Sequence, residues 1–334
     1  MTDGVPPGLF SSTSYEFDMD GRANVVEEVI SGEFPNRSVS SVTRPTRGNH
    51  KQTAIVTFAD GDSVVVQRSP DIDSIRLETA LSGLIRERTT VPVPRVLATG
   101  TVDGHGYAIV EHASGSDLHE QFVTLDTSRQ RRIARTFGQA LGELHDSFSF
   151  ASYGELSLDL NSVGESRMQG TEATDWREWF TSYAQTGFET LSSEFDHIQP
   201  ALAAVVEDAT LPASPPSTLY PWDFRPGNAL VADGEISAIL DWGAPLAAAP
   251  GLSVAKAEHL VADWYVTETD PLRASFKSGY ESVTPYPEIS PVYRLAAIAH
   301  SAVDSNGDVT RPRYPEIAGA DAVEFHIDRF ESVL

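Results

Sequence analysis

Apolar and polar positions alternate along most of the segment from residue 38 to residue 112. Five stretches show this period of two or a run of β-branched residues: "SVSSVTR", "TAIVTFA", "SVVVQR", "RVLATGTV" and "GYAIVEH". Alternation of this kind is typical of strands that bury one face. Asp-Gly pairs at 60–61 and 103–104 indicate tight turns between neighbouring strands. The pattern predicts five strands in a small antiparallel β-lobe.

Helical periodicity marks other parts of the chain. The stretch "DSIRLETALSGLIRER" predicts a helix after the third strand, and residues 20–31 predict one before the first. From about residue 116 the 3.6-residue period dominates, in "RRIARTFGQALGELHDSF", "DWREWFTSYAQTGFETLSSEF", "SVAKAEHLVADWYV" and "PVYRLAAIAHSAV". We therefore expect a larger, mainly helical second lobe.

One β-hairpin interrupts these helices, in the stretch "LYPWDFRPGNALVADGEISAILDWG" at residues 219–243. Its two apolar runs are joined by Asp233-Gly234, a strong signal for a type I′ turn. The strands fold back, so Asn228 at the start of one and Asp241 at the end of the other should meet at the same edge. Asp223, five residues before Asn228, should lie on the loop that enters the hairpin.

Asn and Asp oxygens are hard ligands that suit Mg²⁺, and a further Asp can orient an attacking hydroxyl. Three such side chains at one edge of the hairpin therefore indicate phosphoryl transfer. Taken singly, each residue has a structural alternative, because Asp223 suits a cap, Asn228 a turn and Asp241 the end of a strand. Their joint spacing favours the catalytic interpretation.

Composition narrows the function classes. The 334 residues suffice for two domains or one bilobal domain, and they include no cysteine, which excludes disulfides, thiolate nucleophiles and Cys-ligated zinc. No H-E-x-x-H or G-x-S-x-G motif occurs. An EF-hand-like spacing from Glu16 to Glu27 starts with the wrong residue for a calcium loop, and an aspartate that caps a helix explains it more simply.

The formal net charge is −24, with only three lysines beside many arginines. This balance resembles that of proteins from salt-accumulating cytoplasms, whose acidic surfaces stay soluble when salt screens them. It argues against binding to nucleic acid or an anionic membrane, since both need a basic face. The sequence contains no run of eighteen apolar residues and no secretory signal pattern, so we expect a cytoplasmic protein.

The hairpin region resembles the aminoglycoside phosphotransferase family, which has a protein-kinase-like fold. The resemblance rests on "DFRPGN", an Asp-x4-Asn loop, and on "AILDWG", with thirteen residues from Asn228 to Asp241. It implies that Asp223 is the catalytic base and that Asn228 and Asp241 hold Mg²⁺. ATP or GTP would then donate its γ-phosphoryl group to a hydroxyl of a small metabolite.

The resemblance extends over residues 45–250 and implies further nucleotide-binding residues. "TRGNHKQTAIV" looks like the loop over the phosphates, of whose glycines Gly48 remains. Arg68 stands where the family has a phosphate-pairing lysine, and Glu78 stands where that lysine has its helix partner. "YAIVEH", with Glu111, looks like the hinge beside the adenine.

Two departures from the family pattern accompany these matches. Pro221 and Trp222 replace the usual His-Gly before the catalytic Asp, so the loop must be supported differently, and Arg68 changes the geometry of the strand-three cation. Trp222 and Trp242 are interpreted as packing residues, and His145 as a helix cap or core contact.

The sequence thus predicts an α+β, bilobal protein-kinase-like fold, with an antiparallel β-lobe over 1–112 and a helical lobe over 113–334. Helices after residues 170 and 252 are expected to clamp the acceptor, which the sequence leaves open among sugars, amino alcohols, antibiotics and nucleosides. A catalytically silent nucleotide-binding pseudokinase or scaffold is the alternative. A protein kinase is less favoured because no Ala-Pro-Glu segment follows Asp241. Oligomeric state is not predicted.

Overall fold

The computed structural model describes residues 21–45, 51–159, 167–170, 175–304, 306–311 and 313–334. Its N-terminal lobe is a five-stranded antiparallel sheet in the order β1-β2-β3-β5-β4. The strands are β1 (Val39–Thr43), β2 (Gln52–Phe58), β3 (Ser63–Ser69), β4 (Val96–Val102) and β5 (His105–Glu111). All five predicted strands are confirmed.

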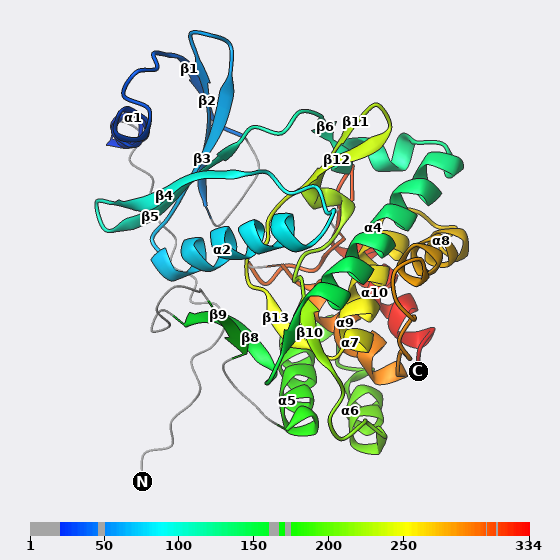
Figure 1. The fold of residues 1–334 in the computed structure, drawn as a ribbon. Helices are drawn as coiled ribbons and strands as arrows, with labels where there is room; N and C mark the ends of the chain where they lie inside the picture. Colours follow the sequence, from blue (N-terminus) through cyan, green and yellow to red (C-terminus); the bar gives the residue numbers. More distant parts are fainter. Residues whose placement is uncertain (1–20, 46–50, 160–166, 171–174, 305, 312) are drawn as a thin grey trace.

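One helix covers each face of this sheet. α1 (Gly21–Glu33) packs Val29 and Ile30 against Val64 and Val66 of β3 in a small apolar cluster. α2 (Ile72–Arg88) crosses the other face, where Gly106 of β5 lies close to its first turn. Figure 1 shows α2 running below the sheet, between the two lobes. These helices match the two predicted at residues 20–31 and 73–88.

Tight turns join the strands as the Asp-Gly pairs predicted. Asp103 and Gly104 have φ of 47° and 71°, and Asp233 and Gly234 have φ of 54° and 81°. Two successive positive φ angles define a type I′ turn, which Asp and Gly adopt at little cost. The predicted hairpin of the second lobe is confirmed, with β11 (Ala229–Ala232) against β12 (Glu235–Ile239) and a shift in register between Leu230 and Val231.

Helices form most of the C-terminal lobe. They are α3 (Leu118–Gln121), α4 (Thr127–Ser147), α5 (Trp176–Glu189), α6 (Gln199–Asp208), α7 (Pro250–Glu258), α8 (Asp270–Glu281), α9 (Pro291–Ala302) and α10 (Ala320–Glu331). Short 3₁₀ turns are η1 (Phe122–Thr124), η2 (Ser193–Phe195) and η3 (Pro226–Asn228), and a π-helical turn, η4 (His259–Asp263), extends α7. The α+β class and the predicted mainly helical second lobe are confirmed.

Short strands also occur in this lobe, where the sequence pattern predicted only the hairpin. β7 (Ser149–Phe150), β8 (Gly154–Asp159), β9 (Arg167–Gly170), β10 (Ser217–Tyr220) and β13 (Leu246–Ala248) form a sheet in the order β7-β10-β13-β8-β9. β6 (Ser116–Asp117) pairs with β11, and β14 (Thr310–Arg311) with β15 (Ile317–Ala318). Strands of two to six residues are too short to show a clear period, so sequence reasoning missed them.

Two apolar clusters stabilise the C-terminal lobe. The larger joins α2, α4, α8 and the hairpin, and the second is rich in aromatic side chains from α5 and α9. Trp176 of α5 is fully buried, and its indole N–H donates to the Tyr293 hydroxyl at 3.1 Å. Among the helices of the described residues, none is long and apolar enough to cross a membrane.

α4 and α8 lie side by side in unusually close contact (Figure 1). A Cβ atom on Gly138 of α4 would stand 1.9 Å from the carbonyl oxygen of Phe276, and one on Gly279 of α8 would stand 1.9 Å from that of Arg135. Both obstacles are backbone atoms of the opposite helix, so neither can move aside alone. The absence of a side chain at these two positions sets the distance between the helices.

We predict that Gly138→Ala lowers the free energy of unfolding by about 1–3 kcal/mol or more, because overpacking outweighs the better helix propensity of alanine. Gly83→Ala in α2 is the matched control, since a Cβ there meets nothing within 4 Å. The control should gain roughly 0.5–1 kcal/mol. Chemical denaturation of both variants checks this, and equal stability changes would contradict the close-contact interpretation.

Candidate active site

The loop between β10 and β11 holds Asp223 in one orientation. One carboxylate oxygen of Asp223, Oδ1, accepts a hydrogen bond from Arg225 Nε at 2.6 Å. The other, Oδ2, accepts one from Asn228 Nδ2 at 2.8 Å, and the same amide nitrogen donates to the Asp223 backbone carbonyl at 2.8 Å. Two donors on two oxygens leave the carboxylate little freedom to rotate.

These contacts also set the charge of Asp223. Burial by itself would raise its pKa, but the Arg225 charge, the hydrogen bonds from Arg225 and Asn228, and the more distant Lys256 outweigh burial and lower the pKa below its usual value. Asp223 is therefore a carboxylate at neutral pH, with lone pairs available for a hydroxyl proton.

Asn228 also ties this loop to the far end of the hairpin. Its backbone carbonyl accepts a hydrogen bond from Leu240 N at 2.7 Å, and Leu240 directly precedes Asp241. The strands next to this contact are in register, with Ala229 opposite Ile239. Asn228 and Asp241 consequently emerge at the same edge, as the hairpin pattern predicted.

Asp241 has an unusual backbone conformation. Its φ is 59°, in the left-handed region, which aspartate enters more readily than most residues other than glycine. Its side chain is 53% exposed. The carboxylate is therefore half exposed just after the end of the hairpin.

A lysine links this carboxylate to the N-terminal lobe. Lys51, directly before β2, donates from Nζ to Glu78 Oε2 of α2 and lies 3.2 Å from Asp241 Oδ1. Burial tends to lower the pKa of Lys51, but the two carboxylates outweigh it and raise that pKa. Three segments from both lobes thus meet at one ammonium group.

The predicted partner of Glu78 was Arg68, and that pairing is wrong. Arg68 lies opposite Tyr107, whose hydroxyl donates to Glu33 of α1 at 2.5 Å, so this face of the sheet points toward α1. Successive side chains on a strand point to opposite faces, which turns Arg68 away from α2. Gln52 is paired with Arg68, so the side chain of Lys51, one residue earlier, points to the other face of the sheet, toward Glu78.

Sequence reasoning therefore missed Lys51, although a signal was present. In "SVVVQR" Arg68 is an even number of residues from Val64 and Val66, which are buried. Its side chain therefore points to the same, apolar face of the sheet. The Nε atom of Arg68 is buried and makes no hydrogen bond within the part of the chain that the structure describes.

The remaining predicted nucleotide residues have simpler positions. Glu111 is exposed at the end of β5, where the chain passes toward the second lobe. Just beyond it, the Ser237 hydroxyl donates to the Ser114 carbonyl at 2.7 Å and fixes the connecting segment to the hairpin. Gly48, like the EF-hand-like aspartates of the N-terminus, lies outside the described residues.

His145 and Trp242, which the sequence suggested were packing residues, pack in the core of the second lobe. His145 is buried and its ring nitrogens lie 2.8 Å from the Tyr280 hydroxyl and 3.0 Å from the Ser253 hydroxyl. Burial lowers the pKa of His145 to about 3, so the ring is neutral. Trp242 is buried and donates to the Ile239 carbonyl at 3.1 Å.

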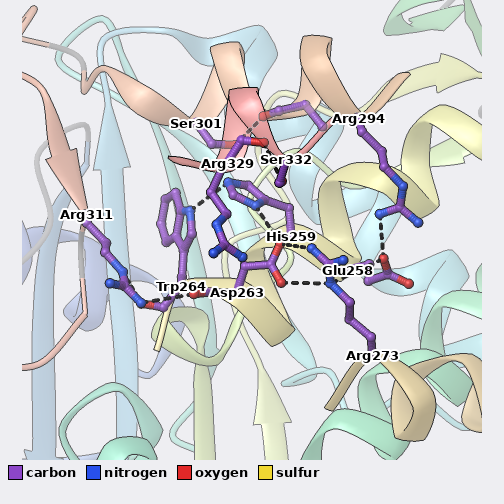
Figure 2. Close-up of polar contacts among 11 residues, drawn as sticks. Glu258, His259, Asp263, Trp264, Arg273, Arg294, Ser301, Arg311, Arg329 and Ser332 are labelled. Carbon is purple, nitrogen blue, oxygen red and sulfur yellow. Dashed lines mark hydrogen bonds and ion pairs between the residues drawn. The ribbon is translucent and has the colours of Figure 1, made fainter. Parts of the chain in front are cut away.

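A second polar cluster supports the loop from behind. Asp263 of η4 receives hydrogen bonds from His259 at 3.1 Å and from two nitrogens of Arg273 at 2.9 and 2.7 Å, and Figure 2 shows them converging on its carboxylate. Against the effect of burial, these partners lower the pKa of Asp263 to about 2. Arg311 also donates from Nε to the Trp264 carbonyl at 2.6 Å.

This cluster is structural in character. The cavity beside it measures about 10 Å³, room for one water at most. The fixed Trp264 presents its ring to the Arg225 guanidinium, whose carbon lies 5.6 Å from the ring centroid. The cluster therefore supports the arginine that holds Asp223.

The donor set suits a magnesium ion. The side-chain amide nitrogen of Asn228 donates to Asp223, so its amide oxygen is available to a cation. Asp241 adds a half-exposed carboxylate. Asp241 and Glu78 share the single ammonium group of Lys51. Nowhere in the described ranges do three or more His, Asp or Glu side chains form a metal site, so the ion would take its other ligands from water and phosphate.

A two-lobed fold with Asp and Asn on a catalytic-type loop, an Asp after a hairpin and a lysine–glutamate pair between the lobes defines a kinase-like phosphotransferase. The family model described as "Phosphotransferase enzyme family" matches residues 41–292, most of the chain. The chain belongs to this family and is a phosphotransferase. A comparison with curated proteins finds no match.

Solved structures confirm the fold. Aminoglycoside phosphotransferase APH(4)-Ia is 17% identical with a TM-score of 0.61, and the match covers 93% of this chain and 98% of that one. A protein assigned as a fructosamine-3-kinase from Haemophilus somnus 129PT is 15% identical with a TM-score of 0.59, over 92% and 96% of the two chains. The GDP and kanamycin complex of APH(2")-IIia is 13% identical with a TM-score of 0.59, over 92% and 98%.

We predict that Lys51 and Glu78 are energetically coupled and that Arg68 and Glu78 are not. A double-mutant cycle of Lys51→Met with Glu78→Gln, measured by denaturation, should give a coupling of about 0.5–3 kcal/mol, the range for residues in contact. The matched cycle of Arg68→Met with Glu78→Gln should give a value near zero. Coupling in the Arg68 cycle alone would reverse the assignment.

Proposed function

We propose that the protein is a small-molecule kinase that transfers the γ-phosphoryl group of ATP or GTP to a hydroxyl of a small metabolite. The observation that carries this proposal is the hydrogen-bonded unit of Asp223 and Asn228, joined through the hairpin to Asp241. It presents an oriented carboxylate beside two oxygen ligands for a cation. Solved relatives of the same fold in complex with ADP and hygromycin B, or with GDP and kanamycin, support both a nucleotide donor and a small hydroxylated acceptor.

The proposed nucleotide site lies between the lobes. Lys51, held by Glu78, would neutralise phosphate charge, the role that sequence reasoning gave to Arg68. Glu111 and the segment after it would lie beside the adenine, and the loop with Gly48 would cover the phosphates. Since nucleotide donors are present inside cells, we place the activity in the cytoplasm.

In the proposed reaction the acceptor hydroxyl oxygen attacks the γ-phosphorus while the bond to the bridging oxygen of the nucleotide breaks. The hydroxyl proton passes to Asp223, and the nucleoside diphosphate leaves. The lowered pKa of Asp223 makes it a weak base. Its main contribution is therefore to orient the hydroxyl and to accept the proton late, as the phosphoryl group is transferred.

Asn228 and Asp241 would hold Mg²⁺, which supplies positive charge against the phosphate oxygens when bound. Arg225 keeps Asp223 ionised and fixed through its hydrogen bond at 2.6 Å. Helices after residues 170 and 252 would clamp the acceptor, whose identity the sequence leaves open.

Replacing Asp223 by Asn tests the proposal. It removes an interaction that matters mainly in the transition state, so kcat should fall by roughly 10²–10⁴ with little change in nucleotide affinity. A metabolite-library screen for nucleotide consumption identifies the acceptor for the assay. Asp233→Asn, in the exposed hairpin turn, is the control, because it makes the same chemical change nearby and Asn tolerates the left-handed backbone.

Turnover of the Asp223→Asn variant close to that of the parent would remove Asp223 from catalysis. Nucleotide binding by the parent without consumption of any hydroxylated acceptor would favour the silent pseudokinase or scaffold instead.

Replacing Asp241 by Asn tests the metal assignment. The loss of an anionic ligand should weaken Mg²⁺-dependent nucleotide binding at least about tenfold, the lower end of what changes around a metal site cost. Calorimetry with ATP or GTP, with and without Mg²⁺, measures this. Unchanged Mg²⁺-dependent affinity in the variant would show that Asp241 does not hold the ion.

A further inference from the structure

A buried lysine lies directly behind the catalytic loop. Lys256 of α7 is only 3% exposed. Its ammonium nitrogen lies 3.2 Å from the centroid of the Trp222 ring and 3.3 Å from the backbone carbonyl oxygen of His300. Trp222 is the residue immediately before Asp223, so the ammonium group contacts the loop one residue away from the proposed base.

The charge of Lys256 has no direct counter-ion. Within the described residues no carboxylate lies within ion-pair distance of Nζ, and the Asp223 carboxylate is paired with Arg225. Burial of an ammonium group without an ion pair is unfavourable, and the contact with the Trp222 ring offsets part of that cost. Burial lowers the pKa of Lys256 to about 7, and the negative charge of Asp223 opposes this lowering.

This attraction is mutual, because Lys256 is also among the groups that lower the pKa of Asp223. Other ionisable groups packed around Lys256 modify it only weakly. Arg225 repels it from the loop side, and His300 of α9 is neutral, since burial and Lys256 lower the pKa of that ring to about 3. Tyr220 and Tyr183 are uncharged phenols hydrogen-bonded to each other at 2.8 Å.

The Trp222 ring is fixed from its other sides as well. The His300 ring meets it edge-on at 5.6 Å and the Tyr220 ring lies at 6.1 Å. His300 is in turn stacked on Tyr183 at 4.0 Å, and its Nε2 lies 2.8 Å from the Tyr183 carbonyl oxygen. A side chain added at Gly187 would stand 2.8 Å from the His300 ring, so α5 approaches that ring closely.

We propose that Lys256 is a positioning residue for the catalytic loop: its ammonium group contacts the Trp222 ring, and its hydrogen bond to the His300 carbonyl fixes that contact to α9. This inference rests on the proposed function for its effect on turnover. Its effect on the position of Trp222 is independent of any reaction. Support for the loop by Lys256 and Trp222 also answers how a chain with Pro221-Trp222 in place of His-Gly keeps Asp223 in position.

The test compares Lys256→Met, which keeps length and removes charge, with Lys256→Arg. In Lys256→Met the kcat should fall about tenfold to hundredfold, the scale of a small misplacement of a reacting group, while nucleotide KM stays nearly constant. Lys256→Arg should retain most of the turnover, since it keeps a cation that can stack on the Trp222 ring.

Lys277→Met is the matched control, because Lys277 is half exposed on α8 and the same charge is lost there. Its kcat should equal that of the parent. Should Lys256→Met fail to fold, Trp222→Leu tests the same contact from the other partner and should also lower kcat with little change in KM.

A measurement without turnover separates this inference from the kinase proposal. In ¹H–¹⁵N NMR, with the Trp222 indole signal assigned by its loss in Trp222→Leu, that signal should move in Lys256→Met, stay close to the parent position in Lys256→Arg and stay unchanged in Lys277→Met. An unchanged Trp222 indole signal in Lys256→Met overturns the inference even if the enzyme is active. A shifted signal supports it even if no acceptor is found.

Discussion

The side-chain amide of Asn228 is the contact on which the whole site depends. Its nitrogen holds the Asp223 carboxylate at 2.8 Å, and the carbonyl of the same residue anchors the end of the hairpin at Leu240. One residue therefore fixes the distance between the proposed base and Asp241. A loop alone would place these groups loosely, whereas a two-stranded ladder closed by a type I′ turn gives them one spacing.

Ion pairs of Lys51 join the N-terminal lobe to the end of the hairpin. Lys51 comes from the sheet, Glu78 from α2 and Asp241 from the hairpin, so a change in the relative position of the lobes must break at least one ion pair. Burial is the main cause that raises the pKa of Glu78, and Asp241 adds to it against the pull of Lys51.

Local patterns predicted the parts of the site that depend on neighbouring residues. Asp223, Asn228 and Asp241 lie within one loop and hairpin, which the Asp233-Gly234 turn closes and a shift in register between Leu230 and Val231 adjusts. The partners of Lys51 are 27 and 190 residues away, so only the alternation of side chains along the strands pointed to the face on which it lies. The short strands of the second lobe were missed for a related reason, since pairing between distant segments creates them.

The use of lysine in so acidic a chain has a physical explanation. Of the three lysines, Lys51 pairs with Asp241 after the hairpin and Lys256 contacts Trp222 on the loop before Asp223, although arginine is far commoner elsewhere in the chain. Lys51 has two carboxylates to bridge from one point, and Lys256 must fit between a tryptophan face and a backbone carbonyl. A compact ammonium on a flexible stem can do both, whereas the planar guanidinium imposes its own fork geometry. Arginine is found where that geometry is used, as in the two hydrogen bonds from Arg273 to Asp263. Lysine therefore occurs where the site needs a compact cation rather than a planar one. One such position lies beside the hairpin and the other beside the loop before Asp223.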